Sequence, residues 1–132
     1  MKSPGRKAVI TGIGVLSSIG IGKENYWEAL VQGKTGFSSL TLFDASHYTV
    51  SIAGEIRDFD PVAFLGKKGL RELDRSTRLV CSASGLAIND AGLTITDEDS
   101  HSMGVSIGTT FGSLHSISQF DRVGLVEGPR LV

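Results

Sequence analysis

The sequence has one cysteine, three histidines and almost no excess of charge among its 132 residues. A lone cysteine excludes a disulfide framework, and scattered histidines beside it exclude a cysteine-rich zinc site. Thirteen basic residues stand against 14 acidic ones, a net charge of −1. Nucleic-acid binding normally needs a basic excess, so we expect no nucleic-acid partner. A reducing, cytoplasmic location is the default for such a chain.

The sequence also lacks long hydrophobic runs. No stretch approaches the roughly 18 consecutive apolar residues that a membrane-spanning helix needs. A basic N-terminus followed by the apolar stretch 8–22 superficially resembles a secretory signal. Glycines and serines interrupt that stretch, and residues 23–26 do not form a small-residue cleavage site. We therefore expect no membrane partner.

What the chain does contain is glycine, 17 residues or about twice the usual share. Many backbone positions should therefore lie in tight turns or close approaches. The 40% hydrophobic and 20% charged content is that of an ordinary folded domain. The length favours one domain, so we expect no internal boundary within residues 1–132.

Three segments are predicted to be strands. The β-branched runs 7–12 and 103–109 should be buried strands, and 50–56 should be an edge strand. Strands that alternate with helices predict an α/β fold with at least partly parallel pairing. Two central strands are too few to cover two long helices, and residues 127–132 break off in a turn signal. The fold is therefore expected to be incomplete.

Helices are predicted over 23–32, over a single turn at 61–65, over 68–90 and over 112–124. Gly33 should end the first of them. In the last, the residues expected to face inward are Leu114, Ile117 and Phe120.

Two glycine motifs suggest phosphate binding, and both fail on their spacing. Gly12-Ile13-Gly14 follows a predicted strand, but Ser17 stands where a dinucleotide fingerprint needs Gly or Ala, and the helix begins too late. The segment 33–35 resembles the end of a phosphate loop, but it closes a helix instead of opening one. Structural turns are the better interpretation, with a nucleotide-binding oxidoreductase as the remote alternative.

Cys81, followed by small residues, resembles a nucleophile elbow. An elbow needs a preceding strand and a sharp turn, whereas Cys81 lies in the middle of a predicted helix, beside Val80 in its apolar stripe. We expect a buried, structural cysteine. The histidines His47, His101 and His115 have no paired spacing, which favours solvent or capping roles.

A basic cluster lies around the start of the longest predicted helix, with Glu72 and Asp74 among it: Lys67, Lys68, Arg71, Arg75 and Arg78. Such a cluster is usually a solvated face. The sharper alternative is a docking surface for an acidic partner.

Ten short segments, taken in order, resemble the N-terminal part of the β-ketoacyl-acyl carrier protein synthases, type II elongating condensing enzymes. They are VITGIG at 9–14, YWEAL at 26–30, GKTG at 33–36, FD at 43–44, AGE at 53–55, DFD at 58–60, LDRS at 73–76, DAGL at 90–93, GT at 108–109 and GPR at 128–130. No one segment is decisive, but ten in register cover nearly the whole chain.

The resemblance implies the N-terminal part of a thiolase-like layered α/β fold in an enzyme that works as a homodimer. That family condenses a cysteine-bound acyl group with malonyl-acyl carrier protein and releases carbon dioxide. Its substrates are acyl and malonyl thioesters, and no cofactor is implied. The family's nucleophilic cysteine and two histidines come later in the chain, so this segment is expected to carry no catalytic residue and to be inactive alone.

The resemblance also implies roles for four residues. Phe111 matches a position that lines and gates the acyl pocket, usually a smaller aliphatic residue, so a preference for short acyl chains is expected; ordinary core packing is the alternative. Lys68, Arg71 and Arg130 match positions that dock the acidic carrier protein. Glu72 and Leu131 replace residues that are usually basic, which should weaken docking or indicate a different carrier. A second hypothesis is a non-catalytic ketosynthase-like partner, or chain-length factor.

Overall fold

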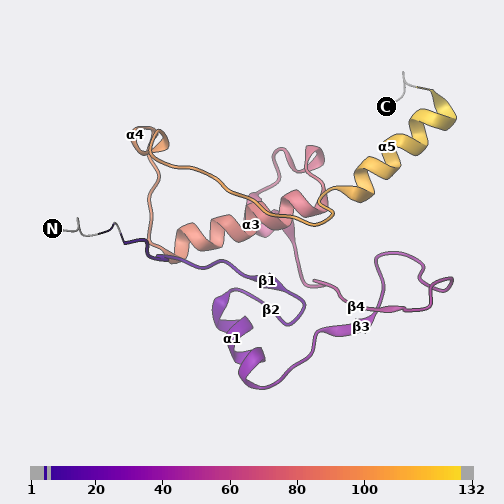
Figure 1. The fold of residues 1–132 in the computed structure, drawn as a ribbon, viewed down its shortest axis with the longest axis horizontal. Coiled ribbons are helices and arrows are strands. Elements are labelled where there is room, and N and C mark those ends of the chain that lie inside the picture. Colours follow the sequence, from indigo (N-terminus) through magenta and orange to yellow (C-terminus); the bar gives the residue numbers. More distant parts are fainter. Residues whose placement is uncertain (1–4, 6, 129–132) are drawn as a thin grey trace. The chain divides into compact units, whose positions relative to one another are not determined.

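The computed structural model describes residue 5 and residues 7–128 (Figure 1). In chain order its elements are β1 (Leu16–Ser17), β2 (Gly20–Ile21), α1 (Lys23–Val31), β3 (Phe37–Ser39), β4 (Ile52–Gly54), α2 (Pro61–Leu65), the 3₁₀ turn η1 (Leu70–Glu72), α3 (Arg75–Asp90), α4 (Asp97–Ser100) and α5 (Leu114–Glu127). The described residues divide into two compact units. The first comprises the chain up to Phe59 with 83–94, and the second 60–82 with the chain from 95 onward.

The first unit begins with a short strap, residues 12–14, that lies against the C-terminal half of α3. A Cβ atom at Gly14 would meet the carbonyl oxygen of Ala83 and lie 2.8 Å from the backbone nitrogen of Ala87. A Cβ at Gly12 would lie 2.7 Å from the backbone nitrogen of Ala91. Side chains do not fit at such distances, so the two glycines allow the strap backbone to touch the helix.

After the strap, the chain turns back through the antiparallel pair β1–β2 and enters α1. Gly22, with φ at +86°, makes the bend into the helix, and its amide donates to the Val15 carbonyl over 2.8 Å. The helix ends at Val31, two residues before Gly33, whose φ of +65° glycine adopts without steric cost. Both the predicted helix 23–32 and its glycine stop are confirmed.

A second antiparallel pair, β3–β4, is held by the buried carboxylate of Glu55. The carboxylate accepts the backbone amides of Thr41 and Leu42 over 2.8 and 3.0 Å, and the Thr41 hydroxyl over 2.8 Å. The Thr41 amide, followed by that of Leu42, lowers the pKa of Glu55 to about 2. The predicted strand 50–56 thus exists as β4, shorter than expected.

The second unit contains α2, η1, the first half of α3, α4 and α5. Asp60 caps α2, as its side chain accepts the Val62 amide over 2.9 Å, and the predicted turn 61–65 is confirmed. Between α3 and α5, Thr96 and Asp99 form a reciprocal capping box that starts α4.

The long helix begins later than predicted. Leu73 is extended, with φ −101° and ψ 127°, so α3 starts at Arg75 and the 3₁₀ turn η1 stands apart from it. Asp74 accounts for the boundary because its carboxylate accepts the Thr77 amide over 2.7 Å. An aspartate that bonds forward to the backbone favours a helix start over a helix interior.

The two predicted central strands are absent from the described residues, in which β1–β2 and β3–β4 are the only strand pairs and both are antiparallel. Val9 and Ile10 are 79% and 85% exposed, and Val105 is 87% exposed. A strand needs a neighbouring strand that exchanges backbone hydrogen bonds with it. Among the described residues, neither 7–12 nor 103–109 has such a neighbour. Residue 5 and residues 7–128 therefore contain none of the parallel pairing that was expected.

The apolar face of α5 is exposed, contrary to the prediction. Leu114, Ile117 and Phe120 are 53%, 55% and 59% exposed. The periodicity correctly predicted a helix, but nothing in the described part of the chain covers its apolar stripe.

Replacing Gly14 by alanine should destabilise the fold by about 1–3 kcal/mol, since the new methyl group must displace the backbone of α3. Gly85, within α3, has open space around a Cβ and provides the matched control. Gly85→Ala should raise stability by about 0.5–1 kcal/mol through helix propensity. Thermal unfolding followed by circular dichroism measures both; equal transition temperatures for the two variants would contradict the close packing of the strap.

Candidate functional site

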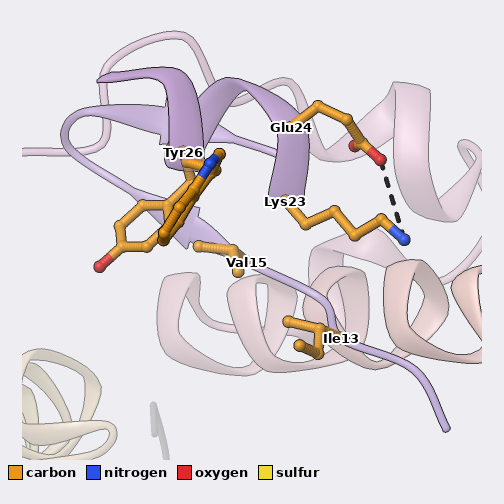
Figure 2. A pocket seen from close by; sticks show the side chains of 6 residues that line it. Ile13, Val15, Lys23, Glu24 and Tyr26 are labelled. Carbon is orange, nitrogen blue, oxygen red and sulfur yellow. Dashed lines mark ion pairs between the residues drawn. The ribbon is translucent and has the colours of Figure 1, made fainter. Parts of the chain in front are cut away.

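The first unit contains an apolar pocket beside the strap. It has a volume of about 410 Å³ and is lined by Ile13, Val15, Lys23, Glu24, Tyr26 and Trp27. Figure 2 shows Ile13, from the strap, and Val15, which follows it, on one side and the first turn of α1 on the other. Trp27 is 64% exposed, so one wall of the pocket is open to solvent.

Charged groups fix the pocket's geometry. The Asp90 carboxylate accepts the Ile13 amide over 2.9 Å and pairs with the Lys23 ammonium, which also lies 3.8 Å from Glu24. Lys23, and next the Ile13 amide, lower the pKa of Asp90, while Asp90 raises that of Lys23. The charge of Lys23 is thus already matched, and the pocket offers apolar contact more than ion binding.

The described residues hold no group of three histidine, cysteine or acidic side chains that could bind a metal ion, and no helix among them is long and apolar enough to cross a membrane. All three histidines are exposed. Cys81 lies in the middle of α3, as predicted, but it is exposed and not buried. The strap contacts α3 further along the chain, at Ala83 and Ala87, and leaves Cys81 uncovered.

In the second unit, the loop that carries Phe111 is tied to the start of α3. The Ser76 hydroxyl donates to the carbonyl of Gly112 over 2.8 Å, and Ser113 bonds to the Asp74 carboxylate. Within the loop, the Gly112 amide donates to the Thr109 hydroxyl over 2.9 Å. The Phe111 side chain itself is 73% exposed, so its backbone is held while its ring is open to solvent.

Asp74 serves both the helix and the loop. Ser113, and then the Thr77 amide, lower the pKa of the Asp74 carboxyl. The same carboxylate thus caps the start of α3 and bonds to Ser113, the N-cap residue of α5.

The predicted docking residues Lys68 and Arg71 are exposed. Arg71 belongs to η1, which is tied to α3 where the Arg78 guanidinium donates to the Leu70 carbonyl over 2.6 Å. Arg130 lies outside the described residues. Within the second unit, α3 therefore supports both the 3₁₀ turn that bears Arg71 and the loop that bears Phe111.

Sequence reasoning missed the loop anchors Asp74, Ser76 and Ser113. The spacing of Asp74 and Thr77 is a helix-start signal that could have been found. No local pattern identifies Ser76, whose partner Gly112 is 36 residues away.

Comparisons with known proteins define the class. The family model described as "Beta-ketoacyl synthase, N-terminal domain" matches residues 6–127. Among curated proteins, the 3-oxoacyl-[acyl-carrier-protein] synthase 2 of Synechocystis sp. is 36% identical over 94% of this chain and 30% of its own length. The protein of the same name from Coxiella burnetii is 37% identical over 96% of this chain and 31% of its own.

A solved structure described as "The ishigamide ketosynthase/chain length factor" shares the fold, with a TM-score of 0.75 and 34% identity over 91% of this chain and 30% of that one. The chain therefore belongs to the β-ketoacyl synthase family, and its fold is part of a thiolase-like α/β fold. It spans about 30% of the length of the curated relatives that it matches.

The Asp90 contacts predict a pH dependence. Because the pKa of Asp90 in the folded chain lies below its ordinary value of 3.8, its stabilising effect is complete above about pH 4 and is lost as the pH falls through the lowered value. Asp90→Asn should lower stability near neutral pH and flatten the acid limb of the stability profile.

Glu24→Gln is the matched control, because Glu24 also faces Lys23 but is 79% exposed at its side chain. Its profile should follow that of the unmodified chain. The measurement is the urea midpoint at a series of pH values, followed by the emission of the single tryptophan, Trp27. If the pH dependence of the urea midpoint in Asp90→Asn ran parallel to that of the unmodified chain, the role of Asp90 in acid stability would be contradicted.

Proposed function

We propose that this chain is the N-terminal part of a 3-oxoacyl-acyl carrier protein synthase, which condenses an acyl thioester with malonyl-acyl carrier protein in fatty acid or polyketide biosynthesis. The observation that carries the proposal is the family match over residues 6–127, supported by relatives of that name at 36–37% identity. The whole of residues 1–132 would form one partial ketosynthase domain of a cytoplasmic homodimer.

The nucleophile of this reaction would come from outside the chain. In the family's chemistry a cysteine thiolate takes the acyl group from its carrier, and the carbanion formed when malonyl loses carbon dioxide then displaces that thiolate. Cys81 is a poor candidate because it lies mid-helix, and a nucleophilic cysteine needs an activating base or a helix N-terminus. The chain alone should therefore form no acyl-enzyme.

A second candidate is a non-catalytic partner that sets chain length. It is favoured by one observation, the similarity to a solved protein described as a ketosynthase/chain length factor. The two candidates share the fold and differ in whether the completed chain carries the nucleophilic cysteine.

A chimaera tests the proposed function. Residues 6–127 of this chain, the part that matches the family, replace the equivalent segment of the Synechocystis enzyme. The chimaera should condense acyl- and malonyl-acyl carrier protein, because the relative supplies the nucleophile, whereas the separate 132-residue chain should take up no acyl group by intact mass spectrometry. A folded chimaera without condensing activity would contradict the proposal.

In the same chimaera, Phe111→Ala should extend the longest product by at least one condensation cycle, because removing an aromatic ring widens a narrow pocket. Product lengths are read by mass spectrometry of the carrier-bound acyl chains. The control is Phe120→Ala, which removes a ring of similar exposure from α5. An unchanged product length in the Phe111 variant would contradict the gating role.

Carrier docking should depend on the exposed cations of the second unit. Lys68→Glu with Arg71→Glu is expected to weaken binding of the acidic carrier protein about tenfold at low salt, mainly through the association rate, with a smaller effect at high salt. Lys34→Glu, an exposed reversal in the first unit, should leave binding nearly unchanged. Surface plasmon resonance with the chimaera measures both. A loss of binding free energy in the double variant only twice that of Lys34→Glu would indicate net charge alone, because the double variant reverses twice as many charges.

A further inference from the structure

We propose that Ser76 and Asp74, at the start of α3, are positioning residues that fix the loop of Phe111 and thereby set how far its ring can move. For acyl-chain length this inference rests on the proposed function. The hydrogen bonds themselves can be tested without it.

The loop is bound to α3 through two separate contacts. The Gly112 carbonyl accepts the Ser76 hydroxyl over 2.8 Å, and the next residue, Ser113, bonds to the Asp74 carboxylate. Both contacts are partly buried, where a hydrogen bond competes less with water than on an open surface. Two adjacent residues of the loop are thus anchored to one helical turn.

The loop is also fixed internally. Gly112 has φ at +46° and donates its amide to the Thr109 hydroxyl over 2.9 Å. The Phe111 carbonyl accepts the Leu114 amide over 3.0 Å, so the backbone of Phe111 already belongs to the turn that leads into α5. The backbone at Phe111 and Gly112 is therefore held by hydrogen bonds, both within the loop and to α3.

The ring of Phe111, in contrast, is 73% exposed. An aromatic side chain has few rotatable bonds, so its reach is largely set by the position of its Cα atom. When the backbone is fixed beforehand, less ordering entropy is lost as the ring meets a ligand. A ring on an anchored loop can thus restrict an acyl chain more sharply than the same ring on a free loop.

Amide exchange measures the anchor directly in the 132-residue chain. In the unmodified protein the amides of Gly112 and Leu114 are hydrogen-bonded and should exchange slowly. Ser76→Ala should speed their exchange about two- to tenfold, the effect expected for one hydrogen bond. Two-dimensional NMR resolves both amides, and the Arg78 amide, bonded to the Asp74 carbonyl, reports that α3 remains folded.

Two variants control this measurement. Ser76→Thr keeps the hydroxyl and should retain the slow exchange. Ser84→Ala removes an exposed serine from the same helix and should leave both amides unchanged. Equal exchange rates in Ser76→Ala and the unmodified chain, with the Arg78 amide still protected, would overturn the anchoring role.

Ser113→Ala tests the second contact independently. It should raise the pKa of Asp74, because Ser113 is the first cause of its lowering, and this is read from the titration of the carboxyl carbon by NMR. An unchanged titration would overturn the Ser113–Asp74 contact.

The functional consequence is read in the chimaera, in which residues 6–127 of this chain replace the equivalent segment of the Synechocystis enzyme. Ser76→Ala should broaden the spread of product lengths toward longer chains, with a larger effect on kcat/KM for long acyl substrates than for short ones. Unchanged lengths despite faster exchange would overturn the positioning role. An unmodified chimaera that makes no product would count against the proposed function, while amide exchange still decides whether the anchor exists.

Discussion

The direct contact of the strap 12–14 with α3 is the constraint on which the first unit depends. The glycines remove the side chains that would hold the two backbones apart, and the Asp90 carboxylate binds the amide of Ile13 between them. From this fixed point the chain turns through β1–β2 into α1, whose first residue returns to the same carboxylate through Lys23. One acidic side chain near the end of α3 thus determines where two separate segments lie, and the apolar pocket between those segments follows from it.

The second unit is built on the other half of the same helix. Asp74 starts α3 and binds Ser113, Ser76 binds the neighbouring carbonyl, and Arg78 holds η1. Polar groups in the first turn of one helix therefore fix the positions of two segments, η1 and the loop of Phe111. The sequences of these segments do not themselves indicate where they pack. Each of these side chains also satisfies a backbone donor or acceptor that would otherwise face water or remain unpaired.

The elements that sequence predicted well are those fixed by local interactions. Helix α1 with its glycine stop, the proline-led turn α2 and the body of α3 depend on propensity, caps and periodicity within a few residues. The segments 7–12 and 103–109, which were predicted to be strands, can form strands only when neighbouring strands pair with them. Their apolar composition does not indicate whether such neighbours are present. The family resemblance implied roles for Phe111, Lys68 and Arg71, which stay predictions. It could not reveal the bond from Ser76 to Gly112, because two residues 36 positions apart leave no common pattern in one sequence.

The segment 104–108 has a consequence for how the protein is handled in solution. Its residues lie outside the helices and strands, they are all exposed, and their backbone groups make no hydrogen bond to the described chain. A protease binds its substrate as an unpaired strand, so this segment can enter a protease cleft without any prior unfolding. Limited digestion should therefore cut here first and leave α5 on a separate peptide, and any covering chain that pairs with the segment would also act as its protection against cleavage.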